Sequence, residues 1–305
     1  MTRIINPKKV YTYHQLSVDI DRLNETYPDL LAVDVIGKSV AERSVFSLKL
    51  GSGKQEILVN GAHHAREWLT TTLLMDMVET YCLAASTNQC IGSYPVKDIL
   101  KQVTIYFIPM VNPDGVTLVQ QGPELFLNSC KLREWNNNKD DFMDWKANIR
   151  GVDLNRQYPV DWEQIHHDPG RPAPMNFKGY AALSEPEVKA VYNFVSGHDF
   201  KLAVAYHSSG EEIFWKYKST GEQEKYAKKI ANITSNKTGY QLIYPTDNPS
   251  GGGFTDWFIS HFKRPSLTIE IAPLVGPRPV PLSYYDKIWN ENKEVPLELA
   301  NQLII

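Results

Sequence analysis

The stretch EILVNGAHHAREWLTTTLLMDMVETYCL, residues 56–83, decides the fold of this chain of 305 residues. It opens with a short apolar run, 56–60, which ends at Gly61. Over 67–83 the apolar side chains recur at the spacing of a buried helix, along a length that suits a helix better than a strand. The stretch therefore predicts a buried strand that leads directly into a helix.

Similar patterns on both sides of this junction predict that strands and helices alternate. Apolar spacing predicts helices at 13–26, 223–234 and 284–302, and strands at 31–35, 45–50, 103–111, 201–206 and 266–271. Residues 184–187, Ser-Glu-Pro-Glu, have the pattern of a capping box, so a further helix should begin after Ser184 and end near His198. Residues 112–115, Asn-Pro-Asp-Gly, predict a turn. We expect an α/β fold, with a single domain over 1–305 and a mixed, mostly parallel, twisted sheet flanked by helices.

Composition and charge exclude several classes of partner. With 42% hydrophobic and 22% charged residues, the chain has the composition of a soluble globular protein. A formal net charge of −3 and an isoelectric point near 6.3 leave no excess of basic residues for phosphate contacts, so we expect no nucleic-acid partner. We expect no membrane contact either, because no stretch is long and apolar enough to span a bilayer.

The N-terminal residues and the cysteines bear on location. Residues 1–10 include three basic side chains but no apolar core of a secretory signal. Three cysteines, an odd number, differ from the even set that is typical of a disulfide-linked secreted scaffold. We therefore expect a cytoplasmic protein and interpret the sequons at Asn232 and Asn236 as chance matches.

Three potential metal ligands follow predicted strands. His64 and Glu67 come after the strand at 56–60, and His207 comes directly after the strand at 201–206. Open α/β sheets bind ligands at the carboxyl ends of their strands, and His-x-x-Glu at a helix start puts both side chains on one face. Two histidines and one glutamate leave a fourth position for water, which is typical of a catalytic zinc site. A lone histidine at a strand end is more often satisfied by backbone groups, but neither histidine stands alone here.

With these residues the sequence resembles the M14 family of zinc metallocarboxypeptidases. Residues 61–68, Gly-Ala-His-His-Ala-Arg-Glu-Trp, look like the family's zinc-site signature. Other landmarks follow in the family's order: Asn-Pro-Asp-Gly at 112–115, Gly-Val-Asp-Leu-Asn-Arg at 151–156, His-Ser at 207–208, Ser-Gly-Gly-Gly at 250–253, Asp-Trp at 256–257 and Thr-Ile-Glu at 268–270. The resemblance covers about residues 10 to 300, and several motifs in one order are more specific than any one of them.

The resemblance implies the catalytic roles. His64, Glu67 and His207 match the family's ligands to one Zn²⁺ ion, and Glu270 matches its general base. Zinc lowers the pKa of a bound water to about 7. A carboxylate within hydrogen-bond reach accepts that proton and later delivers it to the leaving amine. Because the strand at 266–271 is otherwise largely apolar, we expect Glu270 to face a cleft rather than open solvent.

The resemblance also implies substrate-binding roles. Asn155 and Arg156 match residues that hold the substrate's terminal carboxylate, which a planar guanidinium binds in a bidentate manner, although Arg156 in an exposed salt bridge is the alternative. Arg66 matches a residue that lines the cleft, with a structural ion pair as its alternative. Where the family usually has an arginine for the oxyanion, the best match is Lys146. Arg150 competes for that role, and Lys146 as an ordinary solvated lysine stays open.

The specificity pocket departs from the family's usual pattern. A tyrosine usually precedes the Gly-Gly pair, whereas this chain has Asp-Asn-Pro at 247–249 and its nearest tyrosine is Tyr244. Thr255 stands where the family has an apolar residue for aromatic or aliphatic ends and an acid for basic ends. With Arg156, these features resemble the bacterial branch that hydrolyses the γ-D-glutamyl-meso-diaminopimelate bond of cell-wall peptides. The side chain of diaminopimelate ends in an amine and a carboxylate, so its pocket needs polar partners.

The expected function is therefore zinc-dependent hydrolysis of that bond in a peptide of cell-wall origin. The alternative is a general zinc metallocarboxypeptidase that releases C-terminal amino acids. A non-catalytic zinc-dependent binding module is an interpretation from another class, and the presence of Glu270 argues against it. A zinc deacylase of N-acyl amino acids is disfavoured because such chains lack the landmarks found here at 112–115 and 151–156.

Overall fold

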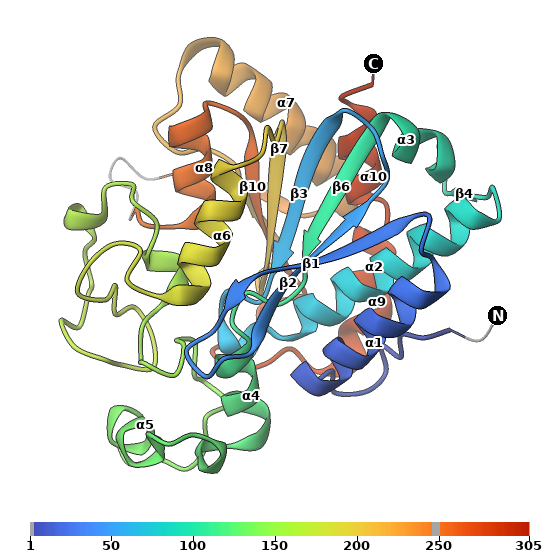
Figure 1. Ribbon diagram of the computed structural model, residues 1–305. Helices are drawn as coiled ribbons and strands as arrows, with labels where there is room; N and C mark the ends of the chain where they lie inside the picture. The colour runs from blue at the N-terminus through green and yellow to red at the C-terminus, as the bar shows by residue number, and fades with distance from the viewer. Residues whose placement is uncertain (1–2, 246–250, 305) are drawn as a thin grey trace.

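The central strands are apolar on both faces, which is typical of parallel strands covered by helices. The computed structural model describes residues 3–245 and 251–304. In it, four strands lie side by side and parallel, in the order β6 (Val103–Ile108), β3 (Gln55–Gly61), β7 (Leu202–Ser208) and β10 (Ser266–Ile271). Every residue of β6 is buried. These strands form the middle of the sheet (Figure 1).

Further strands extend the sheet at both edges. On one side β1 (Leu31–Lys38) pairs antiparallel with β2 (Ser44–Leu50), which pairs antiparallel with β6. On the other side β8 (Glu212–Phe214) pairs antiparallel with β10 and parallel with β9 (Gln241–Ile243). The order is β1-β2-β6-β3-β7-β10-β8-β9, so the predicted mixed, mostly parallel sheet is confirmed. A separate ladder joins β4 (Cys90–Ile91) to β5 (Tyr94–Pro95).

Helices cover both faces of the sheet (Figure 1). Side chains of β3 alternate between two cores: Ile57 and Val59 face one layer, and Leu58 faces the other. The first layer contains α1 (Tyr13–Thr26), α2 (Leu69–Ser86), α3 (Val96–Gln102), α7 (Gly221–Thr238), α9 (Tyr285–Asn292) and α10 (Val295–Asn301). The second contains α6 (Pro186–Ser196) and α8 (Phe254–Phe262), while α4 (Pro113–Gln121) and α5 (Ser129–Trp135) lie near the carboxyl ends of the strands.

Helix α1 shows how local sequence sets an element. It begins where Oγ1 of Thr12 accepts a hydrogen bond of 3.1 Å from the backbone N–H of Gln15, a standard N-cap. Leu16, Ile20 and Leu23 recur at helical spacing and are buried against the core. Burying each such side chain contributes about 1.5–3 kcal/mol. The helix predicted at 13–26 therefore has both a start signal and an apolar face.

Two local predictions about helix starts are wrong. Ser184 does not cap α6, because its hydroxyl donates to Oε1 of Gln157 at 3.1 Å and Glu185 occupies the N-cap position. Residues 112–115 begin α4 instead of forming a turn. The side chain of Asn112 accepts from the backbone N–H of Gly115 at 2.9 Å and so caps that helix.

Other helices differ from the prediction in length or were missed. The helix predicted at 284–302 is divided into α9 and α10, because Pro296 lies in the first turn of α10 and lacks the N–H that would continue α9. Helices α3, α5 and α8, of seven, seven and nine residues, were not predicted. Apolar runs this short do not distinguish a helix from a strand by periodicity.

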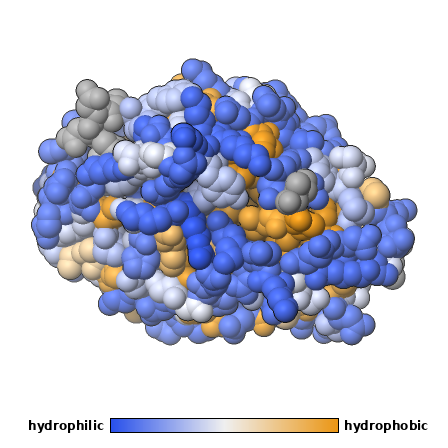
Figure 2. Space-filling model, turned by 90° about the horizontal axis from the view of Figure 1, so that it is seen from above, coloured by the Kyte–Doolittle hydropathy of each residue, from blue (hydrophilic) through white to orange (hydrophobic). Residues whose placement is uncertain are grey.

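The carboxyl ends of the central strands lie at the lower edge of the sheet in Figure 1. Figure 2 shows the molecule from above, at the end opposite to the carboxyl ends of these strands. This surface is mostly hydrophilic, with hydrophobic residues in separate patches. Among the residues that the structure describes, no helix has the length and hydropathy needed to cross a bilayer.

Candidate active site

Three side chains converge at the carboxyl ends of β3 and β7. Nδ1 of His64 lies 2.8 Å from Oε1 of Glu67, and Nδ1 of His207 lies 2.9 Å from Oε2 of Glu67. The two Nδ1 atoms are 3.1 Å apart, and all three side chains are buried. One ligand atom from each residue lies within 4.8 Å of the others. The structure thus brings together the three ligands predicted from the sequence.

The local backbone explains this convergence. Strands β3 and β7 are hydrogen-bonded neighbours, with Gly61 in register with Tyr206, so both chains leave the sheet at the same point. His64 directly precedes a 3₁₀ turn, Ala65–Glu67, that leads into α2. The backbone N–H of Ser208 donates to Oε2 of Glu67 at 3.3 Å and fixes that carboxylate against the end of β7.

The electrostatics of this group suit a divalent cation. Burial raises the pKa of Glu67, but the neighbouring imidazoles of His64 and His207 outweigh it and hold that pKa well below its ordinary value. Burial lowers the pKa of His207, which keeps its ring neutral with a lone pair free to bind a metal. One carboxylate and two imidazoles are the donor set of a catalytic zinc site.

Asp153 contacts His64 at Nε2, the ring nitrogen that does not face Glu67. Its Oδ1 lies 3.3 Å from Nε2 of His64, and its Oδ2 lies 3.6 Å from Nζ of Lys146. Burial raises the pKa of Asp153, but Lys146 and His64 outweigh it and hold that pKa well below its ordinary value. The anionic carboxylate therefore orients the ring so that Nδ1 faces Glu67. Sequence reasoning assigned no role to Asp153, although it lies inside the motif at 151–156.

Glu270 lies next to the ligand group. It is in register with His207 on the neighbouring strand, and it lines a cleft of 340 Å³ together with His64 and Lys146. Burial raises the pKa of Glu270 to about 8, the charge of Glu67 adds to this, and Lys146 opposes it. A bound dication nearby would lower that pKa again. A carboxylate at the edge of a cleft, beside a metal site, is in position to act as a general base.

The structure places most of the predicted substrate residues in the same cleft. Lys146, Asn155, Arg156 and Thr255 all line it. Additional lining residues are polar (Lys216, Asp256, Thr268) or apolar (Phe214, Trp215, Ile243, Tyr244, Pro245). Sequence reasoning missed Lys216, and no local signal could have found it, because its place in the cleft depends on how β8, the strand that it follows, pairs with β10.

Asn155 and Arg156 are held by backbone contacts. Oδ1 of Asn155 accepts from the backbone N–H of Phe254 at 2.9 Å, which leaves the Nδ2 amide to donate to a ligand. Nη1 of Arg156 donates to the carbonyl oxygen of Asn155 at 2.9 Å. Gly252 has φ +70°, and a Cβ there would lie 3.0 Å from the carbonyl oxygen of Arg156, so glycine allows this close packing. Burial raises the pKa of Asp256 to about 6, with Arg156 opposing the shift.

The structure separates the candidates for the oxyanion role by position. Lys146 lines the cleft with 16% of its side chain exposed. Arg150 is 52% exposed, lies 3.6 Å from Oε2 of Glu185 and is not a cleft-lining residue. Arg66 also lies outside the described lining, and its Nη1 donates to the carbonyl oxygen of Asp144 at 3.0 Å. Its charge still acts on Glu270, whose pKa it lowers.

The floor of the cleft is polar and uncharged. Oγ1 of Thr255 lies 2.7 Å from Oγ1 of Thr268. On the wall, the ring of Tyr244 packs edge-on against Trp215, with ring centroids 5.5 Å apart. The departures noted at 247–249, and Ser250, lie outside the residues that the structure describes.

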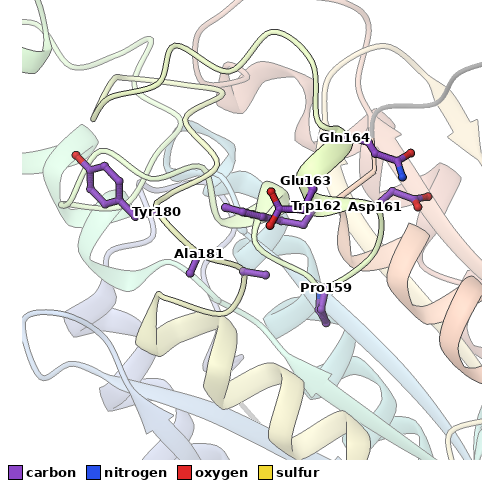
Figure 3. A pocket seen from close by; sticks show the side chains of 8 residues that line it. Pro159, Asp161, Trp162, Glu163, Gln164, Tyr180 and Ala181 are labelled. Atoms are coloured by element: carbon purple, nitrogen blue, oxygen red, sulfur yellow. The ribbon is translucent and has the colours of Figure 1, made fainter.

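A second depression, of 410 Å³, is separate from this cleft (Figure 3). Its lining includes Asp161, Trp162, Glu163 and Tyr180, and none of the three metal ligands. In Figure 3, Tyr180 lies on the side away from Asp161. Asp161 is already paired with Lys218 at 2.6 Å. The chemistry therefore belongs to the cleft beside Glu270.

Comparisons with known proteins agree with this geometry. A model of the family described as zinc carboxypeptidase matches residues 16–295. The chain is 34% identical over 293 residues to gamma-D-glutamyl-L-diamino acid endopeptidase 1 of Lysinibacillus sphaericus, covering 95% of this chain and 72% of that protein. It is 32% identical over 293 residues to an uncharacterized protein of Bacillus subtilis strain 168, covering 94% and 76%. Bovine thrombin-activatable fibrinolysis inhibitor, solved with a tick carboxypeptidase inhibitor, shares the fold, with a TM-score of 0.77, 20% identity and 98% coverage of both chains.

Proposed function

This chain belongs to the zinc carboxypeptidase family and is a zinc-dependent peptidase, and within that family we propose that it hydrolyses the γ-D-glutamyl-diaminopimelate bond of cell-wall peptides. The observation that carries the proposal is the charge of the cleft beside Glu270. Lys146, Arg156 and Lys216 line it, above a floor of two threonine hydroxyls. Identity of 34% to a gamma-D-glutamyl-L-diamino acid endopeptidase supports the same substrate class.

The cleft offers complementary groups to the polar ends of diaminopimelate. Arg156 and Asn155 suit its α-carboxylate, because a guanidinium fork and an amide donate several hydrogen bonds to two oxygens. Asp256 places a carboxyl group in the same cleft for the ammonium at the end of the side chain. The hydroxyls of Thr255 and Thr268 can donate or accept, and so pair with either charged group.

Each residue has a defined task in the proposed reaction. His64, Glu67 and His207 would hold the zinc ion, which would act as a Lewis acid and lower the pKa of a water bound to it. Glu270 accepts a proton from the attacking water and delivers it to the leaving nitrogen. Lys146 supplies a cation where negative charge develops on the scissile carbonyl oxygen, and its contact with Asp153 keeps it in place.

A general zinc carboxypeptidase is the second candidate, and one observation favours it. Phe214, Ile243 and Tyr244 form an apolar part of the cleft wall, which could accept an aromatic or aliphatic side chain. An apolar pocket distinguishes homologous side chains only by about 10- to 200-fold, whereas a site that hydrogen-bonds polar groups rejects analogues lacking them by as much as about 10⁴-fold. The two functions therefore predict different substrate ratios.

Steady-state kinetics on the zinc-loaded protein test the proposal. The value of kcat/KM for γ-D-glutamyl-diaminopimelate should exceed that for a peptide ending in phenylalanine or leucine by about two orders of magnitude or more. Arg156→Ala should remove most of that activity, with Arg150→Ala as the matched arginine outside the cleft. If the phenylalanine peptide is cleaved as well or better, the general carboxypeptidase function replaces this one.

Location and partners belong to the proposal as well. We propose that the protein acts in the cytoplasm on peptides of cell-wall origin, with no nucleic-acid partner. Cys82, Cys90 and Cys130 have free thiols, which supports a reducing compartment. Fractionation of the source cells, followed by detection of the protein in each fraction, tests the location.

A further inference from the structure

We propose that Lys216 is a specificity residue, which binds the distal carboxylate at the end of the diamino acid side chain. The inference rests on the proposed function and deepens it, by assigning a separate residue to the second carboxylate of the substrate. Neither family resemblance nor local sequence pattern indicated a role for this lysine.

Strand β8 leads away from the general base toward Lys216, which follows the end of this strand. On β8, Glu212 is opposite Glu270 and Phe214 is opposite Thr268, so each step of two residues moves away from the general base. Such a step covers about 6.6–6.8 Å. Lys216 follows Phe214 by two residues and lines the same cleft. It follows the end of β8 that points away from Glu270, on the side of the cleft where the far end of a long side chain would reach.

The cations of the cleft have different surroundings, which separates their roles. Lys146 lies beside the ligand group and contacts the buried Asp153. Arg156 donates to the carbonyl oxygen of Asn155 and suits the α-carboxylate of the substrate. A diamino acid with two carboxylates needs a further cation at the distal end, and among the described lining residues Lys216 remains for it.

Lys216 is held at the cleft wall instead of extending freely into solvent. Its Nζ lies 2.5 Å from Oε1 of Glu224 on α7, and 26% of the lysine side chain is exposed. An ion pair this accessible contributes little to stability, so stability does not account for a lysine at this position. The ammonium has three donors, and the contact with Glu224 leaves two for a ligand carboxylate. Glu224 thus positions the group without using up its hydrogen bonds.

Lys218 offers a matched control two residues further on. It also forms one ion pair, with Oδ2 of Asp161 at 2.6 Å, and 49% of its side chain is exposed. Lys218 is not a lining residue of the cleft. Removing either lysine deletes one positive charge from the same segment, but only Lys216 can contact a bound side chain.

The test compares two peptides that differ only in the distal carboxylate: γ-D-glutamyl-meso-diaminopimelate and γ-D-glutamyl-L-lysine. Lys216→Met should lower kcat/KM for the diaminopimelate peptide by about 10- to 100-fold, through KM, since a hydrogen bond to a charged group is lost. The lysine peptide should be hydrolysed as by the wild type. Lys216→Arg should restore most of the preference, and Lys218→Met should leave the ratio of the two kcat/KM values unchanged.

The ratio of the two kcat/KM values is the readout, because a misfolded fraction lowers both values equally and cancels. An unchanged ratio in Lys216→Met, or an equal change in Lys218→Met, would overturn the inference while leaving the proposed function intact. If the wild type cleaves neither peptide, both the inference and the proposed function are wrong.

Discussion

Two glutamates of this protein have pKa values raised to about 8: Glu270 near the end of β10 and Glu187 in the first turn of α6. Burial is the main cause in both, and nearby acids add to it: Glu67 acts on Glu270, while Asp114 and Glu185 act on Glu187. Only Glu270 lines the cleft beside the metal ligands, whereas Glu187 is fully buried. A raised pKa therefore indicates a functional carboxylate only where a substrate can reach it.

The strongest change is expected in the zinc content of the protein, because the metal ligands lie beside Glu270 and not beside Glu187. Wild-type protein should contain about one zinc per chain, and His64→Ala or His207→Ala should lose it, because each removes one of three protein ligands. Metal analysis by mass spectrometry measures this, with His198→Ala, which lies between α6 and β7, as the control. Full zinc retention in both ligand variants is incompatible with this site.

The same substitution in the two glutamates should have opposite consequences for turnover. Glu270→Gln should keep the metal while kcat falls by about 10²- to 10⁴-fold, because the attacking water loses its proton acceptor. Glu187→Gln should leave kcat close to that of the wild type. Single-turnover kinetics on zinc-loaded samples provide the measurement. Near-normal turnover of Glu270→Gln would assign the base to another residue.

Each of these two regions also has a basic residue: Lys146 lines the cleft near Glu270, and Arg150 contacts Glu185 near Glu187. Lys146→Met should lower kcat by about 10²-fold, because one donor to the developing oxyanion is removed. Arg150→Met should have little effect. Equal losses in both variants would argue against Lys146 as the oxyanion group.

Glu187→Gln is expected to change activity least, but it should change how the stability of the fold depends on pH. The pKa of Glu187 is about 8 in the folded protein, against an ordinary value of 4.5 for a glutamate side chain. Between these values the folded state keeps a proton that the unfolded chain releases. This proton therefore stabilises the fold fully below the pKa of the unfolded chain, and the stabilisation is lost as the pH rises through the pKa of the folded protein. One pKa unit corresponds to about 1.4 kcal/mol, so the loss amounts to several kcal/mol.

Urea unfolding at about pH 5 and about pH 9 measures this change, because the slope of stability against pH counts the protons released on unfolding. Glu187→Gln should show a weaker fall in the free energy of unfolding than the wild type. The conservative substitution keeps the shape of the side chain and removes its charge. If wild type and variant depend on pH in the same way, the raised pKa of Glu187 is wrong.

The elements that could be predicted from the sequence are those that a local pattern of apolar residues determines. The strands β3, β6, β7 and β10 form from apolar runs that are largely buried. His64 and Glu67 come shortly after β3, and His207 is the last residue but one of β7. Features that depend on distant contacts were missed. Ser184 lost its capping role to a bond with Gln157, a residue far away in the sequence. Asp153 and Lys216 have their positions only because separate elements meet.

The most direct test of the account is the identity of the bond that is cleaved. Zinc-loaded protein should be incubated with L-alanyl-γ-D-glutamyl-meso-diaminopimelate, beside Glu270→Gln under the same conditions, and the products identified by mass spectrometry. We expect free diaminopimelate and L-alanyl-D-glutamate from the wild type, and intact peptide from the variant over the same time. Release of alanine, or an intact peptide in the wild-type sample, would contradict it.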